Sequence, residues 1–162
     1  MPTPERLPTP IDDGQELKDV RLRILLDLWR AASQKGQMPS RDFIEPGKLG
    51  DLMGWIFLYR VERDPLRFLY LLCGPKIVRR IGLDMTGKYV DEHPQPEARD
   101  GILAMLTAVA TTGRPHRREA PRRILDRDMV TEAMVLPLAG PGGAVDYLLG
   151  IQIIDLPGGD TA

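Results

Sequence analysis

Residues that could carry acid–base, nucleophilic or metal chemistry are few and scattered in this sequence. The chain holds two histidines, His93 and His116, a single cysteine, Cys73, and the serines Ser33 and Ser40. Nucleophilic catalysis needs a hydroxyl or thiol oriented by a base, and neither serine has a histidine near it in the sequence. Two histidines and one cysteine also fall short of a zinc cluster. We therefore predict a protein that is not an enzyme and holds no metal, with catalysis on this fold as the most remote alternative.

The stretch from Gly82 to Tyr89 contains half of a phosphate-binding loop. Gly82, Gly87 and Lys88 have the required spacing, but Tyr89 stands where such a loop needs Ser or Thr for magnesium. The strand before and the helix after the loop are also missing from the pattern. We therefore predict a turn, in which Gly87 takes a positive φ, and no nucleotide binding.

Arginines gather in the segment from residue 113 to residue 127. Such a patch can bind phosphate or an acidic partner, but no aromatic residue is interleaved to stack on bases, so nucleic acid is not predicted as a partner. The alternative, which we favour, is a charged edge strand that resists edge-to-edge pairing. The candidate residues for an anionic partner are Arg117, Arg118, Arg122 and Arg123.

Two helices can be read from the spacing of apolar residues. In residues 15–37, Leu22, Leu25, Trp29 and Ala32 recur at steps of three and four, and Ile24 and Leu28 widen their stripe. Residues 96–112 repeat that pattern. Strands are predicted as a hairpin over residues 55–73 and at 115–120, 129–138 and 145–155, with short helical turns over 75–92. This order of elements predicts an antiparallel α+β fold.

Both faces of the predicted sheet are apolar. Along the first strand Phe57 and Tyr59 share one face, and Ile56 and Leu58 share the other. A sheet open to water on one side would carry polar residues there, so each face must be covered. We expect the helix at 96–112 on one face and the N-terminal helix on the other, or at a dimer interface.

The face toward the helix at 96–112 is the expected position of any pocket. The candidates to line it are Phe57, Tyr59, Tyr70, Met85, Met105 and Tyr147. Tyrosine hydroxyls there could hold a small ligand. The alternative is a core packed without a pocket.

Two motifs carry a resemblance to a known family. The first runs from Met38 through Pro46, and the second from Arg67 to Lys88. Their matching residues are Met38, Pro39, Ser40, Arg41, Ile44, Pro46, Arg67, Phe68, Tyr70, Gly74, Ile77, Val78, Gly82, Asp84, Thr86, Gly87 and Lys88. With the order of elements, they resemble the PAS domain superfamily, in particular a short bacterial single-domain subfamily. The resemblance implies a five-stranded antiparallel sheet with helices on one face, and a sensory or protein-interaction role, frequently as a dimer.

The cofactors of some PAS domains do not suit this sequence. Haem would need an axial histidine on the helix that faces the sheet, and His93 precedes that helix in a predicted loop. Flavin photochemistry would need an asparagine–cysteine stretch, and the chain has no asparagine. We therefore predict neither haem nor flavin. Both histidines are expected at the surface, and Cys73 as a small apolar residue of the core.

The composition of the chain narrows its possible partners and location only slightly. The net charge of −1 gives no pull toward nucleic acid or acidic membranes, and the lone cysteine fits a reducing compartment. We expect a cytoplasmic protein, because no signal peptide or membrane-spanning run is evident. The expected parts are a disordered leader at 1–14, the helix at 15–37, a PAS-like domain at 38–156 and a flexible tail at 157–162.

The resulting hypothesis is a sensory or signalling module that binds a small ligand, associates with a partner protein, or does both, as a homodimer. The alternative is a ligand-free interaction or scaffold protein with a packed core.

Overall fold

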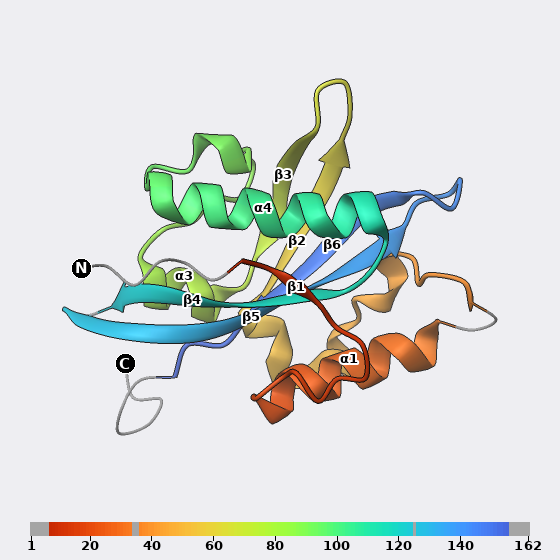
Figure 1. The fold of residues 1–162 in the computed structure, drawn as a ribbon, viewed down its shortest axis with the longest axis horizontal. Coiled ribbons are helices and arrows are strands. Elements are labelled where there is room, and N and C mark those ends of the chain that lie inside the picture. Colours follow the sequence, from red (N-terminus) through yellow and green to blue (C-terminus); the bar gives the residue numbers. More distant parts are fainter. Residues whose placement is uncertain (1–6, 34–35, 125, 156–162) are drawn as a thin grey trace.

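A six-stranded antiparallel sheet forms the middle layer of the computed structural model, which describes residues 7–33, 36–124 and 126–155 (Figure 1). Across the sheet the strands are β1 (Thr9–Pro10), β4 (His116–Ile124), β5 (Arg127–Ala139), β6 (Val145–Gln152), β2 (Ile56–Glu62) and β3 (Arg67–Cys73). The β4–β5 hairpin is long and projects beyond the rest of the sheet in Figure 1. The α+β class and the antiparallel sheet predicted from the sequence are confirmed.

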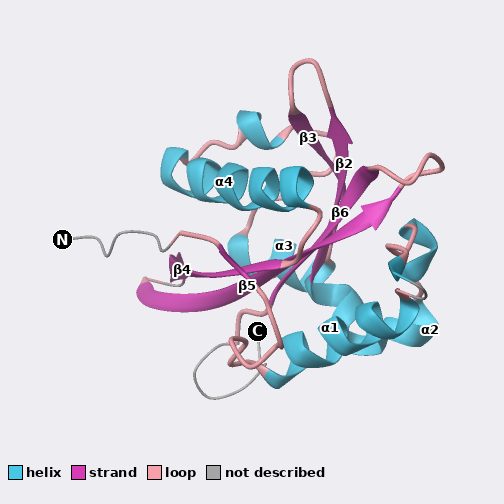
Figure 2. Ribbon diagram, turned by 45° about the vertical axis from the view of Figure 1, so that its right-hand side comes forward, coloured by secondary structure: helices cyan, strands magenta, loops and turns pink. Residues whose placement is uncertain are grey.

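Helices lie on both sides of this sheet (Figure 2). The helices are α1 (Val20–Ala32), α2 (Pro46–Leu49), α3 (Pro75–Ile81) and α4 (Pro96–Thr112), with the 3-10 turns η2 (Arg41–Phe43), η3 (Gly50–Trp55) and η4 (Val90–Glu92). Asp19 caps α1 by accepting a hydrogen bond from the Arg21 backbone N–H at 2.8 Å. Helix α4 has Pro96 in its first turn and ends at Gly113 in the left-handed region, φ 69°. Within the described ranges, no helix is both long and apolar enough to cross a bilayer.

Each face of the sheet carries its own apolar core. On the α1 side the buried cluster takes in Leu22, Leu25, Ile56, Leu136 and Leu149. On the α4 side it takes in Tyr59, Phe68, Met105, Leu106 and Val135. The prediction that both faces must be covered is confirmed, and the chain supplies both covering helices itself.

Helix α1 packs through a narrower stripe than the spacing predicted. Leu22 and Leu25 are fully buried, and Leu26, outside the predicted set, is buried beside them. Leu28 and Trp29 are half-buried, and the Trp29 indole N–H donates to the Pro137 carbonyl of β5 at 2.9 Å. Ile24, expected to widen the stripe, is 48% exposed. Leu22 and Leu25 therefore pack against the chain's own sheet.

The expectation of a disordered leader at 1–14 does not hold for its described part. Thr9–Pro10 form β1, which pairs with Arg117 and His116 of β4. The Ile11 N–H then donates to the Pro115 carbonyl at 3.0 Å, and its side chain is buried. This short strand is the sixth of a sheet for which five were expected. Residues 1–6 and the expected tail at 157–162 lie outside the described residues.

Candidate interior site

A cavity of about 30 Å³ lies between α4 and the sheet. That volume is room for roughly two water molecules. Its walls are formed by Phe57, Tyr59, Ile102, Met105, Leu106, Arg118, Ala133, Met134, Val135, Gly150, Ile151 and Gln152. Because α4 supplies one wall and four strands the other, the cavity occupies the middle of the α4-side core.

Strand register explains why polar groups reach this cavity. Arg118 of β4 pairs with Ala133 of β5, and Ala133 pairs with Gln152 of β6. Paired residues of antiparallel strands point to the same face, so these three side chains stand in a row beneath α4. Ala133, the small residue of the row, leaves room between the two long polar ones.

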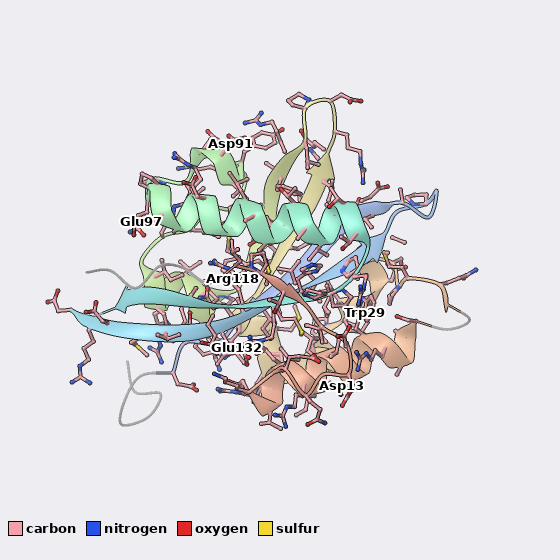
Figure 3. The ribbon with its side chains drawn as sticks, viewed as in Figure 1. Asp13, Trp29, Asp91, Glu97, Arg118 and Glu132 are labelled. Carbon is pink, nitrogen blue, oxygen red and sulfur yellow. The ribbon has the colours of Figure 1, made fainter. Side chains whose placement is uncertain are left out.

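The polar end of the cavity is ordered by hydrogen bonds. The Gln152 side-chain amide donates to the Thr131 hydroxyl at 2.5 Å, and that hydroxyl donates to the Ala120 carbonyl at 3.3 Å. Arg118 is only 4% exposed. In Figure 3 its side chain lies on the α4 side of the sheet, whereas that of Glu132 lies on the α1 side. The site thus has a polar end, formed by Arg118 and Gln152, and is otherwise lined mainly by apolar residues.

Aromatic and methionine side chains form the apolar part of the core around the cavity. The rings of Tyr59 and Tyr70 lie 4.8 Å apart, and the Phe57 ring is 6.0 Å from each. Of the predicted pocket residues, Phe57, Tyr59 and Met105 line the cavity. Tyr70 and Met85 are buried in the same core without reaching its wall.

Tyr147 lies on the opposite side of the sheet from the predicted pocket. It pairs with Arg60, one residue away from the Tyr59–Leu148 pair, and a shift of one residue reverses the face. Its ring packs on the α1-side core, with the Arg41 guanidinium 4.9 Å from its centroid. The expectation that Tyr147 lines the pocket is therefore wrong.

The candidate patch for an anionic partner is not formed where the side chains of the arginine-rich segment are described. Arg117 and Arg118 are neighbours on β4 and so point to opposite faces. Arg117 donates to Glu132 at 2.6 Å and to Glu119 at 3.3 Å, while Arg118 is buried beneath α4. The backbones of Arg122 and Arg123 pair with Met129 and Asp128, and their side chains lie outside the described part.

The Glu132 carboxylate joins the start of α1 to the sheet. It accepts the backbone N–H of Lys18 at 3.0 Å and that of Asp19 at 2.9 Å, besides the Arg117 guanidinium. Lys18 also forms an ion pair with Glu119 at 2.5 Å. We call Lys18, Asp19, Arg117, Glu119 and Glu132 the α1 clasp. Sequence reasoning missed it because Lys18 and Asp19 stand more than a hundred positions before Glu132, and only the folded arrangement of the strands brings them together.

Both histidines are buried, contrary to the surface position expected. His93 and His116 are each 6% exposed. The His93 Nδ1 accepts the Gln95 backbone N–H at 3.1 Å, and the His116 Nδ1 lies 2.9 Å from the Arg114 carbonyl. These bonds are to nearby backbone, which fixes the loops at either end of α4.

The remaining candidates serve local structure. Asp84 accepts hydrogen bonds from the Thr86 N–H at 3.0 Å and hydroxyl at 2.7 Å, and these bonds hold the pKa of Asp84 below its usual range. Gly87 has φ 85°, as the predicted turn requires. Burial raises the pKa of the Cys73 thiol, which disfavours the reactive thiolate. Among the described residues, no three His, Cys, Asp or Glu side chains gather as a metal site.

The family comparison decides the identity of the fold. The family model described as PAS domain matches residues 17–153. The chain belongs to the PAS domain family. The matched region includes the whole of α1. No curated protein matches the sequence.

Among solved structures, the PAS chain is similar to an RNA-binding light-oxygen-voltage receptor, with 16% identity and a TM-score of 0.47 over 91% of this chain and 38% of the receptor. A mutant of Vivid has 12% identity and a TM-score of 0.49 over 80% of this chain and 99% of its own. The N-terminal domain of a diguanylate cyclase from Marinobacter aquaeolei has 17% identity and a TM-score of 0.41, over 60% of this chain and 93% of its own. This chain therefore spans well under half the length of the first of these proteins.

Proposed function

We propose that this PAS protein is a sensory or signalling module that takes up a small molecule between α4 and the sheet. It passes the signal on by associating with other protein chains in the cytoplasm. The observation that carries the proposal is the interior cavity, whose lining combines the polar residues Arg118 and Gln152 with apolar residues such as Phe57 and Met105. Pockets of this kind, mostly apolar with a few fixed polar groups, are typical of small-molecule sites.

A role without catalysis is supported by what the serine hydroxyls do. The Ser33 hydroxyl donates to the Trp29 carbonyl at 2.8 Å at the end of α1. The Ser40 hydroxyl accepts the Asp42 N–H at 3.3 Å at the start of η2. Each hydroxyl is engaged in local backbone structure, and neither contacts the interior cavity.

The size of the cavity limits the ligand. Pockets for drug-sized ligands measure roughly 300–1,000 Å³, whereas this one measures about 30 Å³. Haem or flavin would require the α4 layer to move away from the sheet. The same smallness favours a second candidate function, a ligand-free interaction protein whose core is simply packed.

Association through the outer side of α1 is supported by the apolar residues that this side exposes. Val20 is 61% exposed and Ile24 48% exposed, and they stand four residues apart on one helix face. A second copy of the chain is the partner we propose for this face.

Native mass spectrometry of protein purified from its own host tests the proposal. We expect the wild-type chain to carry a molecule of a few heavy atoms, and Ala133→Leu, which fills the cavity, to lose it. Ala144→Leu, at an exposed position in the β5–β6 turn, is the matched control and should retain it. Removal of the molecule should also shift the sedimentation coefficient of the wild type. Repeated preparations without any bound molecule, and with unchanged sedimentation, would favour the ligand-free function.

A further inference from the structure

We infer that the interior cavity selects a small anion, a planar carboxylate of about three or four heavy atoms, through Arg118. This inference rests on the proposed function, because it requires that the cavity take a ligand. It adds the chemical class of that ligand and the residue that determines it.

Charge is the first argument. Arg118 is buried and its side chain forms part of the cavity wall, whereas none of the described residues in that wall is acidic. In a low-dielectric interior the attraction between a guanidinium and an anion is several times stronger than in water. A cationic ligand would be repelled there, and a neutral one would gain only hydrogen bonds.

Geometry is the second argument. The planar guanidinium presents parallel N–H donors that match the two oxygens of a carboxylate. Arg118 stands beside Ala133 in the β4–β5 register, and Ala133 stands beside Gln152. The short side chain of Ala133 therefore leaves space between the Arg118 and Gln152 side chains, and this is where we place the carboxylate.

Size is the third argument. A cavity of about 30 Å³ accommodates the volume of roughly two waters, which suits formate or, with slight movement of flexible Met105, acetate. Gly150 lies in the sheet wall beside the aromatic rings: a Cβ there would lie 3.3 Å from the Tyr59 ring. A larger side chain at position 150 would therefore push the aromatic wall outward and change the volume.

The test is an NMR titration of ¹⁵N-labelled full-length protein with sodium formate and sodium acetate, and with the neutral analogues formamide and acetamide at matched ionic strength. We expect the two anions to shift the backbone resonances of Ala133, Gly150 and Gln152 saturably, and the amides to leave them unchanged. Arg118→Gln should weaken anion binding at least tenfold. Arg127→Gln, on the same hairpin but exposed, is the matched control and should bind as the wild type does.

Several results would overturn the inference. Formamide binding as tightly as formate would show that charge does not select the ligand. Equal anion affinity in Arg118→Gln would show that another residue does. Anion shifts confined to exposed arginines, or no cavity shift with any probe, would also overturn it. If Arg118→Gln does not fold, the wild-type comparison of anion with amide decides.

A neutral molecule found in the cavity by native mass spectrometry would overturn the anion class and leave the proposed function standing. An empty cavity in both experiments would overturn both the inference and the proposed function.

Discussion

Single residues in this protein owe their roles to the two-residue alternation of strands. Arg117 and Arg118 are adjacent in the sequence, yet one belongs to the α1 clasp and the other to the interior cavity. Tyr59 and Tyr147 are the same residue type and both lie in apolar strands, but their register on β2 and β6 puts them on opposite faces. Residue type alone could name the arginines as anion binders; only pairing between strands shows which of them is buried beside a cavity.

Gly74 gives the sharpest prediction for one position. A Cβ added there would clash with the Gly54 carbonyl group, and backbone cannot give way as a flexible side chain can. We expect Gly74→Ala to lower the free energy of unfolding by about 1–3 kcal/mol, the usual cost of overpacking. The measurement is the urea midpoint at constant m-value. Gly142→Ala is the control, because nothing lies within 4 Å of the position that its added methyl group would take; equal midpoints for the two variants would contradict the clash.

Elements with strong local patterns could be predicted from the sequence, and those that depend on distant pairing could not. The apolar periodicity of α1 and α4 and the β2–β3 hairpin are encoded within each segment. Strand β1 is not, because Thr9–Pro10 has no strand pattern and exists only through its pairing with β4. The cavity lies on the helix–sheet face where the sequence placed any pocket. Its polar end was missed, because Arg118 and Gln152 become neighbours only through Ala133.

Substitutions at two adjacent residues of α1 test whether the buried stripe holds this helix to the sheet. Leu25 is fully buried and Ile24 is 48% exposed. We expect Leu25→Asp to abolish most of the stability, because an unpaired buried charge costs several kcal/mol and a domain has only about 5–15 kcal/mol in total. In dilute protein, where association through this face does not contribute, Ile24→Asp should change the free energy of unfolding by less than about 0.5 kcal/mol. Thermal melts followed by circular dichroism compare them, and similar melting temperatures for the two variants would refute the buried role of the stripe.

At the scale of the whole molecule, the sheet connects its two helical layers through neighbouring residues. On β4, Arg118 borders the cavity and Arg117 belongs to the α1 clasp; on β5, Ala133 borders the cavity and Glu132 completes the clasp. Any shift of these strands on the α4 side therefore moves backbone that holds the start of α1. This arrangement offers a physical route by which a change in the interior could reach the helix that we propose for association.

The clasp itself can be tested by removing its central charge. The side chains of Glu132 and Arg117 are only 10% and 14% exposed. Glu132→Gln therefore leaves the Arg117 guanidinium with less negative charge beside it in a poorly hydrated site. Breaking a buried pair costs about 3–5 kcal/mol; since Glu119 still contacts Arg117, we expect a loss of about 2 kcal/mol.

Hydrogen exchange locates that loss. The α1 amides should exchange faster in Glu132→Gln, because the carboxylate no longer holds the N–H groups of Lys18 and Asp19, while the α4 amides should keep their protection relative to global unfolding. Glu62→Gln removes a more exposed partner of Arg60 and should cost less than about 1 kcal/mol, without selective exchange in α1. Equal acceleration in α1 and α4, or no difference between the two variants, would mean that the carboxylate does not hold α1 to the sheet.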